Sequence, residues 1–139
     1  IDSNLSNFKK IVENREFDIN LNLAISEELD NLTLIKSTAD IMPLSKILNT
    51  HLDKRHIDFL SVNVGGQELT VLNSNKWDLY RPTLVLVGSK IRSREIILFM
   101  DKNKYLYLFS NHINAIFVDK LTTDQNILDL ISWNNQSLK

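Results

Sequence analysis

The chain has 139 residues, of which 43% are hydrophobic and 24% are charged. This composition is typical of one globular domain and excludes collagen-like and low-complexity proteins. Sixteen Lys and Arg residues stand against seventeen Asp and Glu residues, a formal net charge of -1. The chain as a whole therefore offers no basic field for nucleic acid or an anionic membrane. The lack of cysteine excludes disulfides, zinc thiolates and thiol catalysis.

The sequence also contains no pattern typical of a membrane-spanning segment or of a nucleotide-binding loop. No apolar run approaches the roughly 18 residues that span a bilayer, and Ile1-Asp2-Ser3 is not typical of a signal peptide. The three glycines are Gly65, Gly66 and Gly88, and neither GxGxxG nor GxxxxGKS occurs. We therefore expect a cytoplasmic protein that binds neither membrane nor nucleic acid.

Helix and strand patterns alternate from the start of the chain. Residues 4–14 place apolar side chains at helical spacing, with Asn4 or Ser6 as the N-cap. Residues 19–25 alternate apolar and polar positions, which predicts a strand, and residues 31–36 form a second short strand candidate.

The middle of the chain adds two strands and two helices. Pro43 stands where a helix can begin. Residues 57–64 are mostly apolar and β-rich, which predicts a strand buried on both faces. Gly65-Gly66 ends this strand, a helix starts at Glu68, and residues 83–87 form another short buried strand.

The last third predicts a helix, a strand pair and a final helix. The first helix covers residues 91–100, and residues 105–109 and 113–118 form an antiparallel pair. Thr122 or Thr123 then caps a helix with one apolar side, made of Ile127, Leu128, Leu130, Ile131 and Trp133. The whole order predicts an α/β fold with a largely parallel sheet. We divide it into a domain over residues 1–120 and a C-terminal amphipathic helix over residues 121–139.

One segment carries a family resemblance. Residues 57–88 read IDFLSVNVGGQELTVLNSNKWDLYRPTLVLVG, which resembles the FkbM methyltransferase pattern IDFLKIDVEGxExxVL followed by RPxVxxxE. Upstream, residues 1–26 resemble the family's "EPxxxNFxxLxxN…NLAIS" stretch, and MPLSKIL over residues 42–48 is similar to its "VPLxxIL" element. With the closing strand pair included, the resemblance covers about residues 1–118.

The resemblance implies a fold, a cofactor and an activity. The expected fold is α/β, an incomplete Rossmann-like methyltransferase sheet with helices on both faces and a C-terminal antiparallel hairpin. The implied cofactor is S-adenosylmethionine, and the implied reaction is O-methyl transfer to a hydroxyl of a sugar or small molecule. The alternative is a catalytically inactive methyltransferase-like binding or assembly module, and a third and weaker possibility is an unrelated α/β interaction domain.

The resemblance also places cofactor-binding residues. Asp2, with its neighbour Ser3, matches the acidic position that holds the ribose hydroxyls, which a carboxylate can accept in a bidentate way. Ala24, Ile25 and Ser26 match the turn near the adenine. Asn63 matches the aspartate beside the reactive sulfonium. No catalytic residue and no metal ligand is assigned.

The sequence departs from the family pattern at Asn63 and at two nearby positions of the motif. Asn63 replaces an aspartate, and Gly65 and Gly88 replace glutamates, whereas Gly66 and Glu68 are retained. Side chains that would orient substrate or accept a proton are therefore neutral or missing at three positions. These changes favour the inactive module for the chain as given.

The family's first strand and its glycine-rich turn correspond to positions before Ile1. Without that strand, two buried sheet edges would expose unpaired N–H and C=O groups. The alternatives are a fragment of a longer protein, a rearranged sheet, or a gap filled by another chain. We expect a truncated or degenerate member, with a homo-oligomer or a partner chain as one way of completing the sheet.

Each of these residues also has a purely structural reading. Asp2 reads as a frayed terminal residue, Asn63 as a buried turn residue bonded to backbone, and Glu68 as a first-turn residue that complements the helix dipole. Arg81 is expected to pack or to pair at the rim of the sheet. Other side chains are expected to pack or to be solvated: Trp77, Leu79 and Tyr80 between helix and sheet, and His51, His56 and His112, which lack metal spacing and a carboxylate partner, in solvent.

Overall fold

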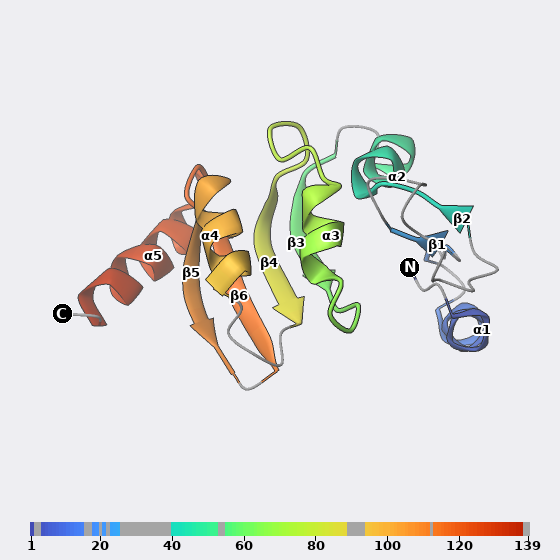
Figure 1. Ribbon diagram of the computed structural model, residues 1–139. Coiled ribbons are helices and arrows are strands. Elements are labelled where there is room, and N and C mark those ends of the chain that lie inside the picture. Colours follow the sequence, from blue (N-terminus) through green and yellow to red (C-terminus); the bar gives the residue numbers. More distant parts are fainter. Residues whose placement is uncertain are drawn as a thin grey trace. The chain divides into compact units, whose positions relative to one another are not determined.

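The computed structural model describes residues 1, 4–15, 18–19, 21, 23–25, 40–52, 55–88, 94–111 and 113–137. These residues form two compact units, one made of Ile1–His51 and Thr70–Asn75 and the other of Leu52–Leu69 and Lys76–Lys139. Figure 1 labels the helices and strands of both units. Within the described residues, no helix is both long and apolar enough to cross a membrane.

The first unit begins with helix α1, Leu5–Asn14. Asn4 is its N-cap, because the Asn4 side chain accepts hydrogen bonds from the backbone N–H groups of Ser6 and Asn7. The helix predicted over residues 4–14 is therefore confirmed. Of the strand predicted over residues 19–25, the structure describes a strand only at β1, Leu23–Ala24, and the candidate strand over residues 31–36 lies outside the described residues.

Strand β1 pairs in parallel with β2, Asp40–Ile41, and α2, Leu44–His51, follows Pro43 as predicted. The start of α2 is bonded to the turn after α3, Glu68–Asn73. Leu44 N donates to Ser74 Oγ at 3.0 Å, and Ser45 N donates to Ser74 O at 3.1 Å. Buried apolar side chains of this unit are Leu44, Ile47, Val71 and Leu72.

The second unit contains a four-stranded sheet of order β3-β4-β6-β5. Its strands are β3, Ile57–Val62; β4, Pro82–Gly88; β5, Tyr105–Ser110; and β6, Asn114–Asp119. In this sheet only the β3–β4 pairing is parallel, whereas the β4–β6 and β5–β6 pairings are antiparallel, so the sheet is mixed and the expectation of a largely parallel sheet is wrong for it. The closing hairpin is confirmed: residues 111–113 are too few for a crossover, so β5 and β6 must be antiparallel.

Strand β3 does not have the predicted burial on both faces. Asp58, Phe59 and Ser61 are exposed, with Phe59 at 53%. The physical reason is position, because β3 stands at one end of the strand order and has β4 as its only described neighbour. An apolar, β-rich run therefore forms an end strand here, a distinction that local composition does not make.

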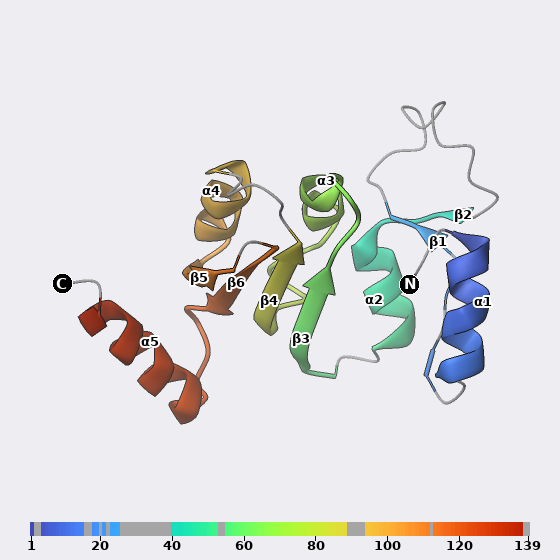
Figure 2. The same cartoon turned by 90° about the horizontal axis from the view of Figure 1, so that it is seen from below.

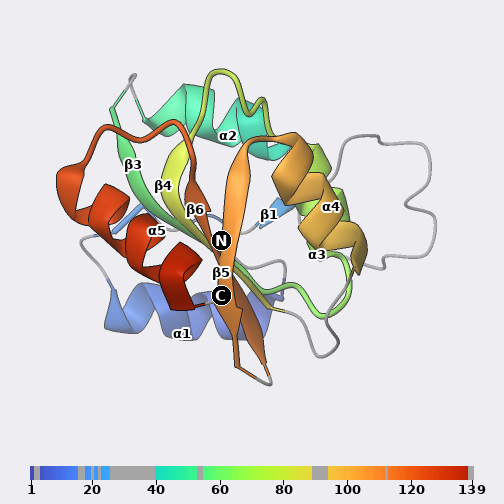
Figure 3. The same ribbon diagram turned by 90° about the vertical axis from the view of Figure 1, so that its left-hand side faces the viewer.

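Helices cover both faces of this sheet. Helix α4, Arg94–Lys102, and helix α5, Gln125–Ser137, lie on opposite faces, as Figures 2 and 3 show. The core of the unit is apolar and includes Val62, Trp77, Val85, Val87, Ile96, Met100, Tyr105, Leu108, Ala115, Phe117 and Val118. The result is an α/β unit with a mixed sheet and a closing hairpin.

Two expectations about side chains in this unit are wrong. Asp124, not Thr122 or Thr123, caps α5, because its carboxylate oxygen accepts from Asn126 N and Ile127 N at 2.9 and 3.4 Å. Leu79, expected between helix and sheet, is 68% exposed in the turn before β4. The predicted division at residue 120 stays a prediction.

Candidate functional site

Three strands of the sheet end at the same edge. Strands β3 and β4 are parallel, and β5 runs with β4 because both are antiparallel to β6. In Figure 1 the arrowheads of β4 and β5 point to the same end of the sheet. Ligands of open α/β sheets bind beyond the carboxyl ends of the strands. We therefore take this edge as the candidate site and name it the carboxyl edge: residues 63–68, Gly88 and the described residues of 110–114.

Asn63 and Gly88 are neighbours at the carboxyl edge. Val62 pairs with Val87, so the next residues, Asn63 and Gly88, lie side by side at the strand ends. A Cβ atom at Gly88 would lie 2.7 Å from Asn63 Oδ1 and 2.9 Å from Asn63 Cγ. The Asn63 carboxamide therefore occupies the space that a side chain at position 88 would need. Asn63 is exposed, so its structural reading as a buried turn residue is wrong.

The loop after Asn63 exposes backbone. Gly65 and Gly66 have φ angles of 65° and 109°, a region that residues with a Cβ rarely adopt. No heavy atom lies within 4 Å of the Cβ position at either glycine, and both residues are exposed. A ligand can therefore approach the bare backbone of this loop closely.

Glu68 holds this loop. Its Oε1 accepts hydrogen bonds from Val64 N at 3.2 Å and Gly66 N at 3.1 Å, and its Oε2 accepts from Gly66 N at 3.0 Å. Glu68 is buried, with 7% of its surface exposed, and is the first residue of α3, Glu68–Asn73. Glu68 therefore stands in the first turn of a helix, as predicted, but its hydrogen bonds are made to the preceding loop, which the prediction did not include. The signal in the sequence was the spacing of two glycines and a glutamate, Gly65-Gly66-Gln67-Glu68, which allows the side chain to bond back to the turn.

The structure describes some of the residues predicted to bind the cofactor. Asn63 lies at the carboxyl edge. Ala24 ends β1 and Ile25 follows it, half-buried, and both belong to the other unit. Asp2, Ser3 and Ser26 lie outside the described residues. The predicted set as a whole stays a prediction, and Asn63 is the member whose surroundings fit a ligand: an exposed amide beside open glycine backbone.

Comparison with known families identifies the family of the chain that carries this carboxyl edge. The sequence profile of the Methyltransferase FkbM domain matches residues 20–109. The chain belongs to the FkbM methyltransferase family. The match includes Asn63, the glycine loop, Glu68 and Gly88, whereas Asp2 and Ser3 precede it. No curated protein and no solved structure matches the chain significantly.

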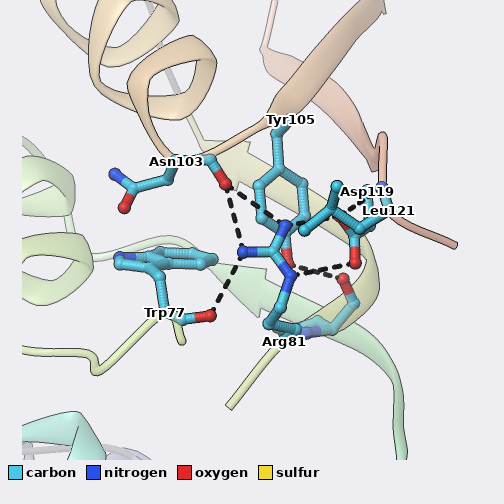
Figure 4. A network of polar contacts seen from close by, with 7 residues as sticks. Trp77, Arg81, Asn103, Tyr105, Asp119 and Leu121 are labelled. Carbon is cyan, nitrogen blue, oxygen red and sulfur yellow. Dashed lines mark hydrogen bonds and ion pairs between the residues drawn. The ribbon is translucent and has the colours of Figure 1, made fainter. Parts of the chain in front are cut away.

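A second polar cluster of this FkbM domain surrounds Arg81 (Figure 4). The guanidinium forms a two-point ion pair with Asp119, in which Nε donates to Oδ2 at 3.1 Å and Nη2 donates to Oδ1. Nη1 donates to the carbonyl oxygens of Trp77 and Asn103, and Nη2 also donates to Asn103 O, each at 3.2 Å. The Arg81 Cζ atom lies 4.9 Å from the centre of the Tyr105 ring. Of the two alternatives expected for Arg81 at the rim, packing or pairing, the structure shows an ion pair with Asp119.

This Arg81 cluster is structural. A guanidinium has five N–H donors, and the five hydrogen bonds engage them all. The cluster also lies at the start of β4, opposite the carboxyl edge, because Arg81 precedes Pro82. It joins the starts of β4 and β5 to the end of β6 and so holds these three strands together at the end opposite the carboxyl edge.

The Tyr105 phenol in this cluster is expected to make the free energy of unfolding fall at alkaline pH. Burial raises the pKa of Tyr105 well above its ordinary value of 10.0, and the Asp119 charge raises this pKa further. As pH rises, the Tyr105 phenol therefore ionises in the unfolded chain before it ionises in the folded chain. The contribution of the protonated phenol to the free energy of unfolding is complete below about pH 10 and is lost as pH rises further. The expected slope is about -1.4 kcal/mol in the free energy of unfolding per pH unit above pH 10.

Chemical unfolding of the wild type and of Tyr105→Phe between pH 8 and pH 11 measures this slope. The variant cannot ionise here, so its curve should lack that part of the decline. It also loses the 2.7 Å bond from Tyr105 Oη to Pro82 O, so it should be about 1 kcal/mol less stable at neutral pH. Two parallel curves would contradict the assignment.

His56 has partners that the sequence did not suggest. Its Nε2 lies 2.8 Å from Thr83 Oγ1 and 3.8 Å from Asp58 Oδ1, so a carboxylate stands nearby that the sequence did not suggest, whereas the expected solvated side chain is confirmed for His56. All three residues stand at the starts of β3 and β4, and the His56 and Asp58 side chains are exposed. Both contacts use the same ring nitrogen, so they do not form a proton relay.

Proposed function

We propose that this FkbM domain takes part in methyl transfer from S-adenosylmethionine to a hydroxyl group of a sugar or another small molecule. The observation that carries the proposal is the family match over residues 20–109, which includes the whole loop between Asn63 and Glu68. The exposed amide of Asn63 supports it, because it offers hydrogen-bonding groups at an accessible strand end, and the exposed glycine backbone at Gly65 and Gly66 allows a ligand to approach closely, although the Gly66 N–H itself donates to Glu68.

We also propose a Rossmann-like methyltransferase arrangement for the sheet. Its support is the parallel pair β3 and β4 followed by the antiparallel β5–β6 hairpin, in the strand order β3-β4-β6-β5. In that arrangement the carboxyl edge faces the cofactor.

The proposed roles of the residues follow the resemblance. Asn63 contacts the cofactor near its reactive centre, with an amide that both donates and accepts hydrogen bonds. Asp2 and Ser3 hold the ribose, and residues 24–26 border the adenine. When bound, S-adenosylmethionine supplies a methyl group on a positively charged sulfur. The residues of the chain bind the cofactor and orient it toward the acceptor oxygen.

One observation favours a second candidate, a methyltransferase-like binding module without activity. Methylation of a hydroxyl releases a proton, which a carboxylate or imidazole base commonly accepts. Among the described residues of the carboxyl edge, Glu68 is the only carboxylate, and both its oxygens already accept backbone N–H groups. The described part of this edge therefore offers binding groups but no available carboxylate base.

Calorimetric titration with S-adenosylhomocysteine and S-adenosylmethionine tests cofactor binding. We expect binding in the micromolar range, about -8 kcal/mol. Asn63→Ala should weaken it by about threefold to tenfold, the contribution of one hydrogen bond, and Asp2→Ala should weaken it as well. Asn126→Ala, an exposed asparagine on α5 outside the family match, is the control and should leave affinity unchanged. No heat from folded protein would reject the cofactor and favour the binding module.

A further inference from the structure

We propose that Gly88 is a positioning residue for Asn63: its missing side chain is what allows the Asn63 carboxamide to lie across the end of β4 and face ligand at the carboxyl edge. The inference rests on the proposed function for the identity of the ligand. The positioning itself depends only on the geometry of the two strand ends.

The backbone at Gly88 does not require glycine. Gly65 and Gly66 are the glycines with positive φ, and Gly88 is not among them. Gly88 instead ends a strand, where glycine is normally unfavourable and commonly marks a close approach of another group. In this chain the glycine therefore provides space at position 88 and not a special backbone conformation.

The nearest atoms to a side chain at position 88 belong to one residue. The three heavy atoms nearest to a Cβ at position 88 all belong to Asn63: Oδ1 at 2.7 Å, Cγ at 2.9 Å and Cα at 3.2 Å. Contacts below 3.0 Å force an atom to move. The first two atoms belong to the carboxamide, so a methyl group at position 88 would displace the Asn63 side chain.

The surroundings decide which group moves. Gly88 is buried, and its strand is paired on the other side with β6, where Gly88 faces Asn114. Strand β4 is therefore held between two neighbours, whereas the Asn63 side chain is exposed and can rotate toward solvent. We expect a substituent at position 88 to turn the carboxamide away while the Asn63 Cα shifts by a few tenths of an ångström.

The test follows the side-chain NH₂ resonances of Asn63 by ¹⁵N NMR, together with affinity for S-adenosylhomocysteine. Four proteins are compared: the wild type, Gly88→Ala, Asn63→Ala and the double variant. Gly88→Ala should shift the Asn63 NH₂ resonances, and each single change should weaken binding by about threefold to tenfold. The double variant should bind no more weakly than Asn63→Ala, because Gly88 acts through the Asn63 side chain.

Two results would overturn the proposal. One is an unchanged Asn63 NH₂ signal in Gly88→Ala. The other is a loss of affinity from Gly88→Ala that is just as large in the Asn63→Ala background, which would indicate a general structural effect. If the wild type binds no S-adenosylhomocysteine, the proposed function fails, and the NMR comparison alone decides the positioning.

Poor folding of Gly88→Ala also gives a decisive outcome. The clash involves Oδ1 and Cγ of Asn63, both of which Asn63→Ala removes. The double variant should therefore recover much of the melting temperature lost by Gly88→Ala. A double variant as unstable as Gly88→Ala would show that the Asn63 side chain is not what position 88 accommodates.

Discussion

Replacing Arg81 with methionine is expected to lower the free energy of unfolding by about 3–5 kcal/mol, the cost typical of breaking a buried ion pair. Asp119 is nearly buried, with 9% of its side chain exposed, and loses both bonds from the guanidinium. The carbonyls of Trp77 and Asn103 lose their hydrogen bonds from Arg81 as well. Methionine keeps much of the apolar stem, so the change isolates the charged head. Urea unfolding followed by circular dichroism measures the loss.

Two further variants sharpen this test. Arg81→Lys keeps the charge but has three donors and no planar fork, so it should restore only part of the stability. Asp119→Asn combined with Arg81→Met should cost less than the sum of the two single changes, because the single Arg81 change leaves an unpaired carboxylate. Strict additivity would mean that the two side chains do not stabilise the fold as a pair.

Replacing Glu68 with alanine is expected to cost about 2–3 kcal/mol in the free energy of unfolding. Hydrogen bonds to a charged group contribute about 1.5–3 kcal/mol, and the Glu68 carboxylate accepts from both Val64 and Gly66. The same change should release the glycine loop, since these bonds fix its backbone at the carboxyl edge. Affinity for S-adenosylhomocysteine should therefore fall together with stability.

Glu95 supplies the matched control for this prediction. It also stands in the first turn of a helix, α4, but it is exposed. Glu95→Ala should change the free energy of unfolding by less than about 0.5 kcal/mol. Equal losses from the two variants would mean that Glu68 acts through the helix dipole, as the sequence alone suggested, and not through the loop.

The family and several helices and strands of both units could be predicted from the sequence, because local sequence patterns indicate them. The motif over residues 57–88 indicated the FkbM family, which the match over residues 20–109 confirms. Apolar positions at helical spacing predicted α1 and α5, and the three residues between β5 and β6 allowed only an antiparallel pair. These signals depend on neighbours along the chain, so no tertiary structure is needed to read them.

Contacts between distant residues were decided only by the tertiary structure. Local composition did not show that β3 stands at one end of the strand order or that β6 lies between β4 and β5, since strand order depends on long-range pairing. The ring of acceptors around Arg81 comes from residues up to 38 positions away. The Asn63 amide lies over Gly88 because of the register of β3 and β4. The sequence by itself therefore determined the family and the candidate residue Asn63, and packing of distant strands determined what surrounds it.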